Sequence, residues 1–128
     1  MRIVLASHHG LAKAMMETAE MVLGKMDNTG AVGLYPGTHP DDYLEELKEA
    51  VDKRAEGEPV LIICDLLAGT PFNVASRISF GNDDIKVIYG MNLGMVVEAF
   101  IGREGMTLDE LTNHLMTQMP VTYGVVRL

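Results

Sequence analysis

The sequence contains a single cysteine and no tryptophan, and aromatic residues make up only 5% of its 128 residues. One cysteine cannot form an intrachain disulfide, which excludes the disulfide framework of small secreted domains. Cys64 lies inside the apolar run 59–64, where we expect an inert, buried side chain. The cysteine content therefore predicts a protein of the reducing cytoplasm.

Basic residues are also scarce, because ten Lys and Arg residues face eighteen Asp and Glu residues and the formal net charge is -8. Such a chain repels a phosphate backbone, so we do not expect nucleic acid as a partner. No apolar run reaches the roughly 18 residues that span a bilayer, and no basic segment precedes an apolar stretch near Met1. These patterns predict a soluble protein.

The alternation of short apolar runs with helical spacing predicts one α/β domain over residues 1–128, without repeats or linkers. Strands are expected at 2–6, 30–35, 59–65, 85–89 and 121–128, and helices at 11–26, 40–55, 74–79, 93–102 and 108–119. Right-handed crossovers then give a doubly wound, mainly parallel sheet with helices on both faces.

Polar residues follow the first and third predicted strands, where His8, His9 and Gly10 come after one strand and Asp65 ends the other. Carboxyl ends of parallel strands share one edge of the sheet, so we expect the His9 ring to meet Asp65. The carboxylate would fix the tautomer of the ring and leave one nitrogen lone pair free for an electrophile. Each residue alone is also typical of an ordinary loop, and the combination favours His9 as a nucleophile.

The loop 68–73, with the sequence Ala-Gly-Thr-Pro-Phe-Asn, has the composition of an anion-binding turn. Gly69 permits a close backbone approach, Thr70 supplies a hydroxyl group, and the amides toward Phe72 and Asn73 open a predicted helix. Thr70 is equally typical of an ordinary helix N-cap. We predict no cofactor and no metal, because His39 and His114 lack any metal-ligand spacing.

Three segments together resemble the mannose-family IIA domain of the sugar phosphotransferase system (PTS): SHHG, ICDLLAGTPFN and GMNLGMVVEA. The resemblance covers essentially the whole chain. It implies phosphorylation of the histidine before glycine, which is His9, and orientation of its ring by Asp65. It also implies that loop residues lie beside the phosphoryl group, namely Gly69, Thr70, Phe72 and Asn73.

The sequence departs from the family pattern at two positions. His8 stands where the family more often has a small or hydroxyl residue, so it is a candidate competitor for the phosphoryl group or a modulator of His9. Gly94 stands where the family commonly has proline, which leaves the start of the next helix less rigid. Neither change removes an expected catalytic group.

The resemblance further implies partners, namely HPr as phosphoryl donor and a IIB component as acceptor, with the membrane reached only through the transporter components. It implies a homodimer in which the last strand, around 121–127, crosses to the partner's sheet and runs antiparallel at its edge. Two alternatives stay open: the phosphoryl-transfer subunit of a dihydroxyacetone kinase, and a non-catalytic regulatory binding module of the same fold.

Overall fold

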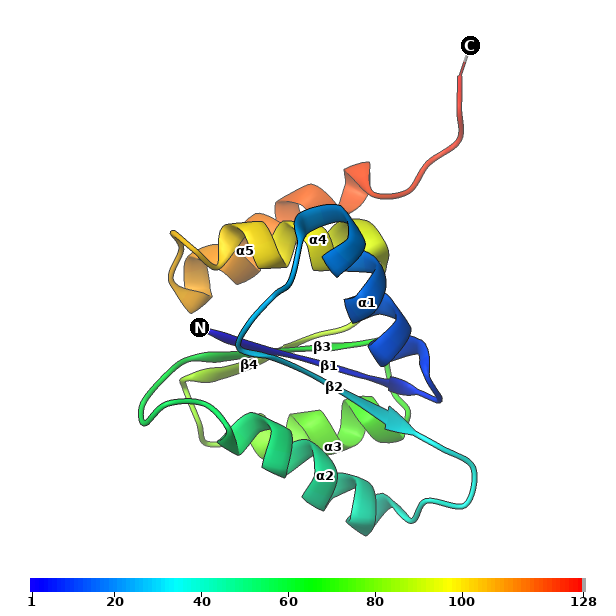
Figure 1. Ribbon diagram of the computed structural model, residues 1–128, viewed down its shortest axis with the longest axis vertical. Coiled ribbons are helices and arrows are strands. Elements are labelled where there is room, and N and C mark those ends of the chain that lie inside the picture. Colours follow the sequence, from blue (N-terminus) through cyan, green and yellow to red (C-terminus); the bar gives the residue numbers. More distant parts are fainter. Residues whose placement is uncertain (128) are drawn as a thin grey trace.

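The structure is a computed structural model that describes residues 1–127 (Figure 1). Its strands are β1 (Arg2–His8), β2 (Thr29–Leu34), β3 (Val60–Cys64) and β4 (Ile85–Ile88). Its helices are α1 (Leu11–Leu23), α2 (Pro40–Asp52), α3 (Thr70–Ser79), α4 (Leu93–Gly102) and α5 (Leu108–Gln118), followed by the 3-10 turn Met119–Val121. Within this part of the chain, no helix is long and apolar enough to cross a membrane.

The four strands form one parallel sheet in the order β2-β1-β3-β4, which confirms the predicted doubly wound α/β fold. The chain leaves β1 toward β2 and then crosses back to β3 on the other side of β1. Strand order therefore reverses between β1 and β3. In such sheets, ligand sites lie outside the carboxyl ends of the strands at this reversal.

Helices cover both faces of the sheet, with α1, α4 and α5 on one face and α2 and α3 on the other (Figure 1). The central strands are apolar on both sides because both faces are covered. In β1, Ile3 and Leu5 pack into the first layer, whereas Val4 and Ala6 pack into the second. All four side chains are fully buried, and their packing fixes the position of the strand that leads to the candidate site.

Most predicted elements form within a few residues of the expected bounds, and the differences have local causes. Helix α1 ends at Leu23, because Gly24 takes a φ of 84° that stops the helix. Helix α3 begins at Thr70, four residues before the expected start, and includes Pro71 in its first turn. In α2, the His39 ring accepts a hydrogen bond from the Asp41 N–H and serves as the N-cap.

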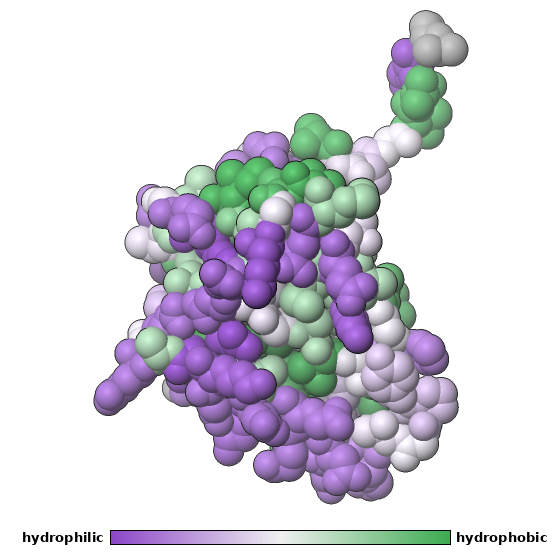
Figure 2. All heavy atoms as spheres, in the orientation of Figure 1, coloured by the Kyte–Doolittle hydropathy of each residue, from purple (hydrophilic) through white to green (hydrophobic). Residues whose placement is uncertain are grey.

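The strand predicted at 121–128 does not form in the single chain, which corrects that expectation. Residues 122–127 have neither strand nor helix, and residue 128 lies outside the described residues. A strand needs a partner edge, and this segment leads away from the body (Figure 1). Figure 2 shows apolar side chains on it, and Tyr123, Val125 and Val126 are 73%, 86% and 82% exposed.

Candidate functional site

The last residue of β1, His8, contacts the carboxylate that follows β3. The His8 Nδ1 atom lies 2.9 Å from Asp65 Oδ2, and the His8 backbone N–H donates to the same oxygen at 2.9 Å. The other carboxylate oxygen, Oδ1, accepts from the Leu66 N–H at 2.9 Å. The backbone N–H and the ring of His8 therefore both contact one carboxylate, at the point where the strand order of the sheet reverses.

The predicted contact between the His9 ring and Asp65 is wrong, because β1 continues through position 8 and the chain turns only at His9. His9 has a left-handed φ of 50°, and its ring lies against Tyr35, the residue after β2, with ring centroids 5.0 Å apart. Strand β1 lies between β2 and β3. The His8 ring thus meets the β3 side, and the His9 ring meets the β2 side.

The contact with Asp65 defines the tautomer of the His8 ring. Burial of Asp65 disfavours its charge, but hydrogen bonds from the His8 N–H, the His8 ring and the Leu66 N–H outweigh burial and hold the pKa of this carboxyl group below its usual value. An ionised carboxylate only accepts hydrogen bonds, so His8 Nδ1 carries the hydrogen. The lone pair of the neutral ring is then on Nε2, and the side chain is 45% exposed.

The backbone of Gly69 lies against the Nε2 edge of the ring. A Cβ atom at this position would lie 3.2 Å from His8 Cε1 and 3.6 Å from His8 Nε2. Gly69 also has a φ of 141° and a ψ of 163°, a conformation that is essentially restricted to glycine. Both the close approach and the dihedral angles therefore require glycine, and they place the 65–69 loop next to the free nitrogen.

The first turn of α3 offers hydrogen-bond donors beside this nitrogen. Gly69 is the N-cap, without a side-chain cap, so the expectation that Thr70 is the N-cap is wrong and Thr70 is the first helical residue. Within residues 1–127, no acceptor is found for the Thr70 and Phe72 amides or for the Thr70 hydroxyl group. Free amides at a helix N-terminus suit a phosphate-like anion.

The other two predicted loop residues have different roles. The Asn73 N–H donates to the Gly69 carbonyl oxygen at 2.8 Å, so this amide is already used inside the turn. The Phe72 ring packs edge-on against Tyr89 with centroids 5.7 Å apart and belongs to the α2 and α3 layer of the core. Of the two backbone amides, that of Phe72 is thus the one available to an anion.

Two buried polar residues support the site and were missed by sequence reasoning. The Ser7 Oγ atom accepts from the Ala12 N–H at 2.7 Å and anchors the start of α1 directly after the site. The Tyr43 hydroxyl group donates to the Val32 carbonyl oxygen at 2.9 Å. Burial, followed by the nearby Cys64 and Asp65, raises the pKa of Tyr43, which stays protonated. The only sign of this role in the sequence was a tyrosine on the apolar face of a predicted helix.

Comparisons with known proteins show which family the chain belongs to. Residues 2–116 match the family described as "PTS system fructose IIA component" (EIIA-man). The chain belongs to this mannose-type IIA family. The resemblance noted in the sequence is thereby confirmed.

The IIA chain is similar to several curated relatives and solved structures. It is 34% identical over 110 residues to the "PTS system mannose-specific EIIAB component" of Escherichia coli (strain K12), which covers 85% of this chain and 34% of that protein. It therefore spans about a third of the length of the curated mannose-specific relatives that it matches.

Two further relatives are similar to this chain over most of both compared sequences. The "PTS system sorbose-specific EIIA component" of Lacticaseibacillus casei is 29% identical over 116 residues, or 91% of this chain and 83% of that protein. The crystal structure of the phosphotransferase system component EIIA from Streptococcus agalactiae superposes with a TM-score of 0.88 at 27% identity, covering 97% and 95% of the two chains.

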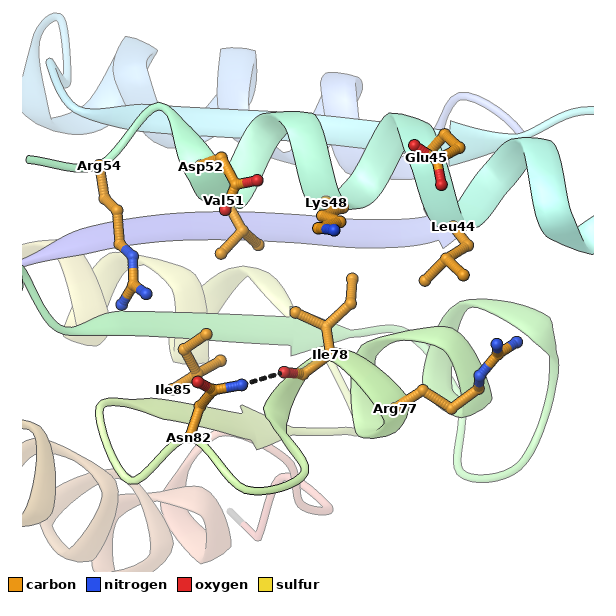
Figure 3. A pocket seen from close by; sticks show the side chains of 10 residues that line it. All are labelled: Leu44, Glu45, Lys48, Val51, Asp52, Arg54, Arg77, Ile78, Asn82 and Ile85. Atoms are coloured by element: carbon orange, nitrogen blue, oxygen red, sulfur yellow. Dashed lines mark hydrogen bonds between the residues drawn. The ribbon is translucent and has the colours of Figure 1, made fainter. Parts of the chain in front are cut away.

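A pocket of about 410 Å³ lies elsewhere in the IIA chain, between α2 and α3 (Figure 3). In Figure 3, Leu44, Val51 and Ile78 point into the gap between the two helices. Ile85, which opens β4, also lines this pocket, so the pocket lies toward the amino ends of the strands. It contains none of the residues around His8 and is separate from the candidate site.

The remaining histidines of the IIA chain are engaged elsewhere. His39 caps α2, and His114 Nε2 lies 3.2 Å from a carboxylate oxygen of Glu98. Among residues 1–127, no group of three or more His, Cys, Asp and Glu side chains is arranged to hold a metal ion.

Proposed function

We propose that this IIA chain is a phosphoryl carrier of a sugar PTS, working in the cytoplasm, which accepts a phosphoryl group from phospho-HPr and passes it to a IIB component. The observation that carries the proposal is the 2.9 Å contact between His8 Nδ1 and Asp65 Oδ2. This contact favours Nε2 of His8 as the acceptor atom. His8 thus replaces His9, for which the sequence pattern predicted this role.

In the proposed transfer, the Nε2 lone pair of His8 attacks the phosphorus atom of the donor's phosphohistidine. The new P–Nε2 bond forms as the donor's P–N bond breaks, and the donor nitrogen keeps the electron pair of that bond. The proton on His8 Nδ1 stays hydrogen-bonded to Asp65, whose negative charge stabilises the positive charge developing on the ring. The same steps in reverse deliver the group to the accepting side chain of the IIB component.

The loop after β3 supports the phosphorylated state in this proposal. The free amides of Thr70 and Phe72 and the Thr70 hydroxyl group are donors for the phosphoryl oxygens. The positive end of the α3 dipole adds a favourable interaction with the dianion. Gly69 leaves room for the group next to Nε2, since any larger residue would place a Cβ atom against the ring.

The acceptor assignment is tested by incubating the chain with phosphoenolpyruvate, enzyme I and HPr. We expect one acid-labile phosphate per chain, which His8→Ala abolishes and the adjacent His9→Ala retains. The two variants are matched controls, because they remove the same ring from neighbouring positions. Labelling that survives His8→Ala and disappears with His9→Ala would assign the acceptor to His9 instead.

The function itself is tested by the discharge of the labelled protein. We expect transfer to a IIB component and restoration of the unlabelled chain. Discharge only to the subunits of a dihydroxyacetone kinase would favour that alternative, and a phosphorylated chain that no partner discharges would favour a regulatory module.

A further inference from the structure

The backbone at His9 has a conformation that glycine adopts more easily. Its φ of 50° lies in the left-handed region, which costs other L-amino acids free energy. The turn is held by the main chain, because the His9 N–H donates to the Leu34 carbonyl oxygen at 2.7 Å. The His9 carbonyl oxygen lies directly against Gly33, where a Cβ atom has no room. The imidazole ring is therefore not needed to form this turn.

The His9 ring also does nothing for the interior of the fold. His9 is an exposed residue, and its ring nitrogens form no hydrogen bond within residues 1–127. Its ring packs edge-on against Tyr35, which is itself 47% exposed. A strained residue with an exposed, unpaired ring points to a role outside the fold.

The position of the pair suggests that role. His8 is flanked on the β3 side by Asp65 and Gly69, and on the β2 side by His9 and Tyr35. A protein that brings its own phosphorylated side chain to His8 Nε2 must approach this edge of the sheet. Half-exposed aromatic rings with polar tips are typical anchors of protein interfaces, since they bury apolar area and still form hydrogen bonds.

We infer that the His9 and Tyr35 pair forms a docking ledge for the protein that delivers the phosphoryl group to His8. The inference rests on the proposed carrier function. It makes His9 a specificity-determining residue and not an acceptor. The ledge contacts the surface of the donor protein beside the phosphorylated side chain, so it affects recognition of the donor more than the bond-forming step.

The test compares a protein donor with a small one in the His9→Gly variant. With phospho-HPr, we expect KM to rise about tenfold and kcat to stay within about threefold, as for the loss of one interface anchor. With inorganic phosphoramidate, which has no surface to contact the ledge, we expect His8 to be phosphorylated at the wild-type rate. The urea midpoint of unfolding should be no lower than in the wild type, because glycine suits the left-handed backbone.

Two more variants sharpen the test. Tyr35→Leu removes the other ring of the ledge and should raise KM for phospho-HPr in the same way. Phe80→Ser removes an aromatic side chain that is 87% exposed just after α3, at the opposite end of this helix from Gly69, and should leave KM unchanged.

The outcomes separate the ledge from the carrier function. If the His9→Gly chain is still labelled on His8 and its KM for phospho-HPr equals that of the wild type, the docking ledge is refuted and the carrier function remains. A raised KM only for the IIB component overturns the choice of the donor as the bound partner. Loss of labelling with both donors makes His9 the acceptor, and a wild-type chain that no donor phosphorylates removes the carrier function and the ledge together.

Discussion

The adjacent residues His8 and His9 differ in the strand that each ring faces, although they are chemically identical. His8 still belongs to β1 and pairs in register with Leu34, and its ring meets Asp65. His9 follows the strand, turns with a φ of 50° and meets Tyr35. Because β1 ends at His8, the His8 ring is fixed by a carboxylate, whereas the ring of the next residue is exposed beside β2.

The effect of adding one methyl group at Gly69 can be predicted from the structure. We expect Gly69→Ala to slow phosphorylation of His8 by about tenfold or more, since the new methyl group lies against the ring and the space beside Nε2 closes. Both its φ of 141° and the contact oppose the substitution. The rate of labelling by phospho-HPr measures the effect.

Gly37→Ala is the matched control, because Gly37 has a φ of 86° and a Cβ atom there meets nothing within 4 Å. Both variants should lose about 1–2 kcal/mol of unfolding free energy from the left-handed backbone. Only Gly69→Ala should lose the phosphorylation rate. Equal rates in the two variants would contradict the assigned role of the loop.

Helix α2 is hydrogen-bonded to β2 near the site through one buried hydroxyl group. Tyr43 is fully buried, and its hydroxyl group joins α2 to β2 by donating to the Val32 carbonyl oxygen at 2.9 Å. Ser7 directly precedes His8, and its own side chain anchors α1. Helices α1 and α2 thus both bind the part of the sheet that leads to His8.

The Tyr43→Phe substitution tests this connection, since it removes one oxygen atom and retains the packed ring. The Val32 carbonyl oxygen would lose one hydrogen-bond donor, so we expect a loss of about 1 kcal/mol in unfolding free energy. Urea denaturation measures it. Tyr35→Phe, which removes a hydroxyl group from a half-exposed ring, should change stability by less than about 0.5 kcal/mol. Equal losses in both variants would show that this hydrogen bond contributes nothing specific.

The whole molecule has an unpaired sheet edge and an apolar terminal segment. Strand β4 ends the sheet order, so its outer edge has no partner strand among residues 1–127. The terminal segment 122–127 begins at Thr122, whose hydroxyl group accepts from the Asn92 side chain at 3.1 Å. A Cβ atom at Gly94 would lie 3.0 Å from Thr122 Cγ2, so glycine here makes room for the segment. An exposed edge and an exposed apolar segment favour association of two copies.

Removal of residues 123–128 tests the predicted homodimer. Truncation after Thr122 retains the contact with Asn92 and removes the exposed Tyr123, Val125 and Val126. We expect the full chain to sediment as a dimer and the truncated chain to dissociate at least about 100-fold more readily, since it loses the apolar area of the exchanged segment. An unchanged sedimentation coefficient would refute the exchange.

Local patterns in the chain were sufficient for the order of the elements, the parallel sheet and the strand end that carries Asp65, because apolar runs and helix signals are read from neighbouring residues. They were not sufficient to choose between His8 and His9. That choice depends on where β1 ends against β2 and β3, and a shift of one residue turns a side chain to the other side. The hydrogen bond from the Tyr43 hydroxyl group to Val32 and the approach of Gly69 to the ring also arise only when distant segments pack together.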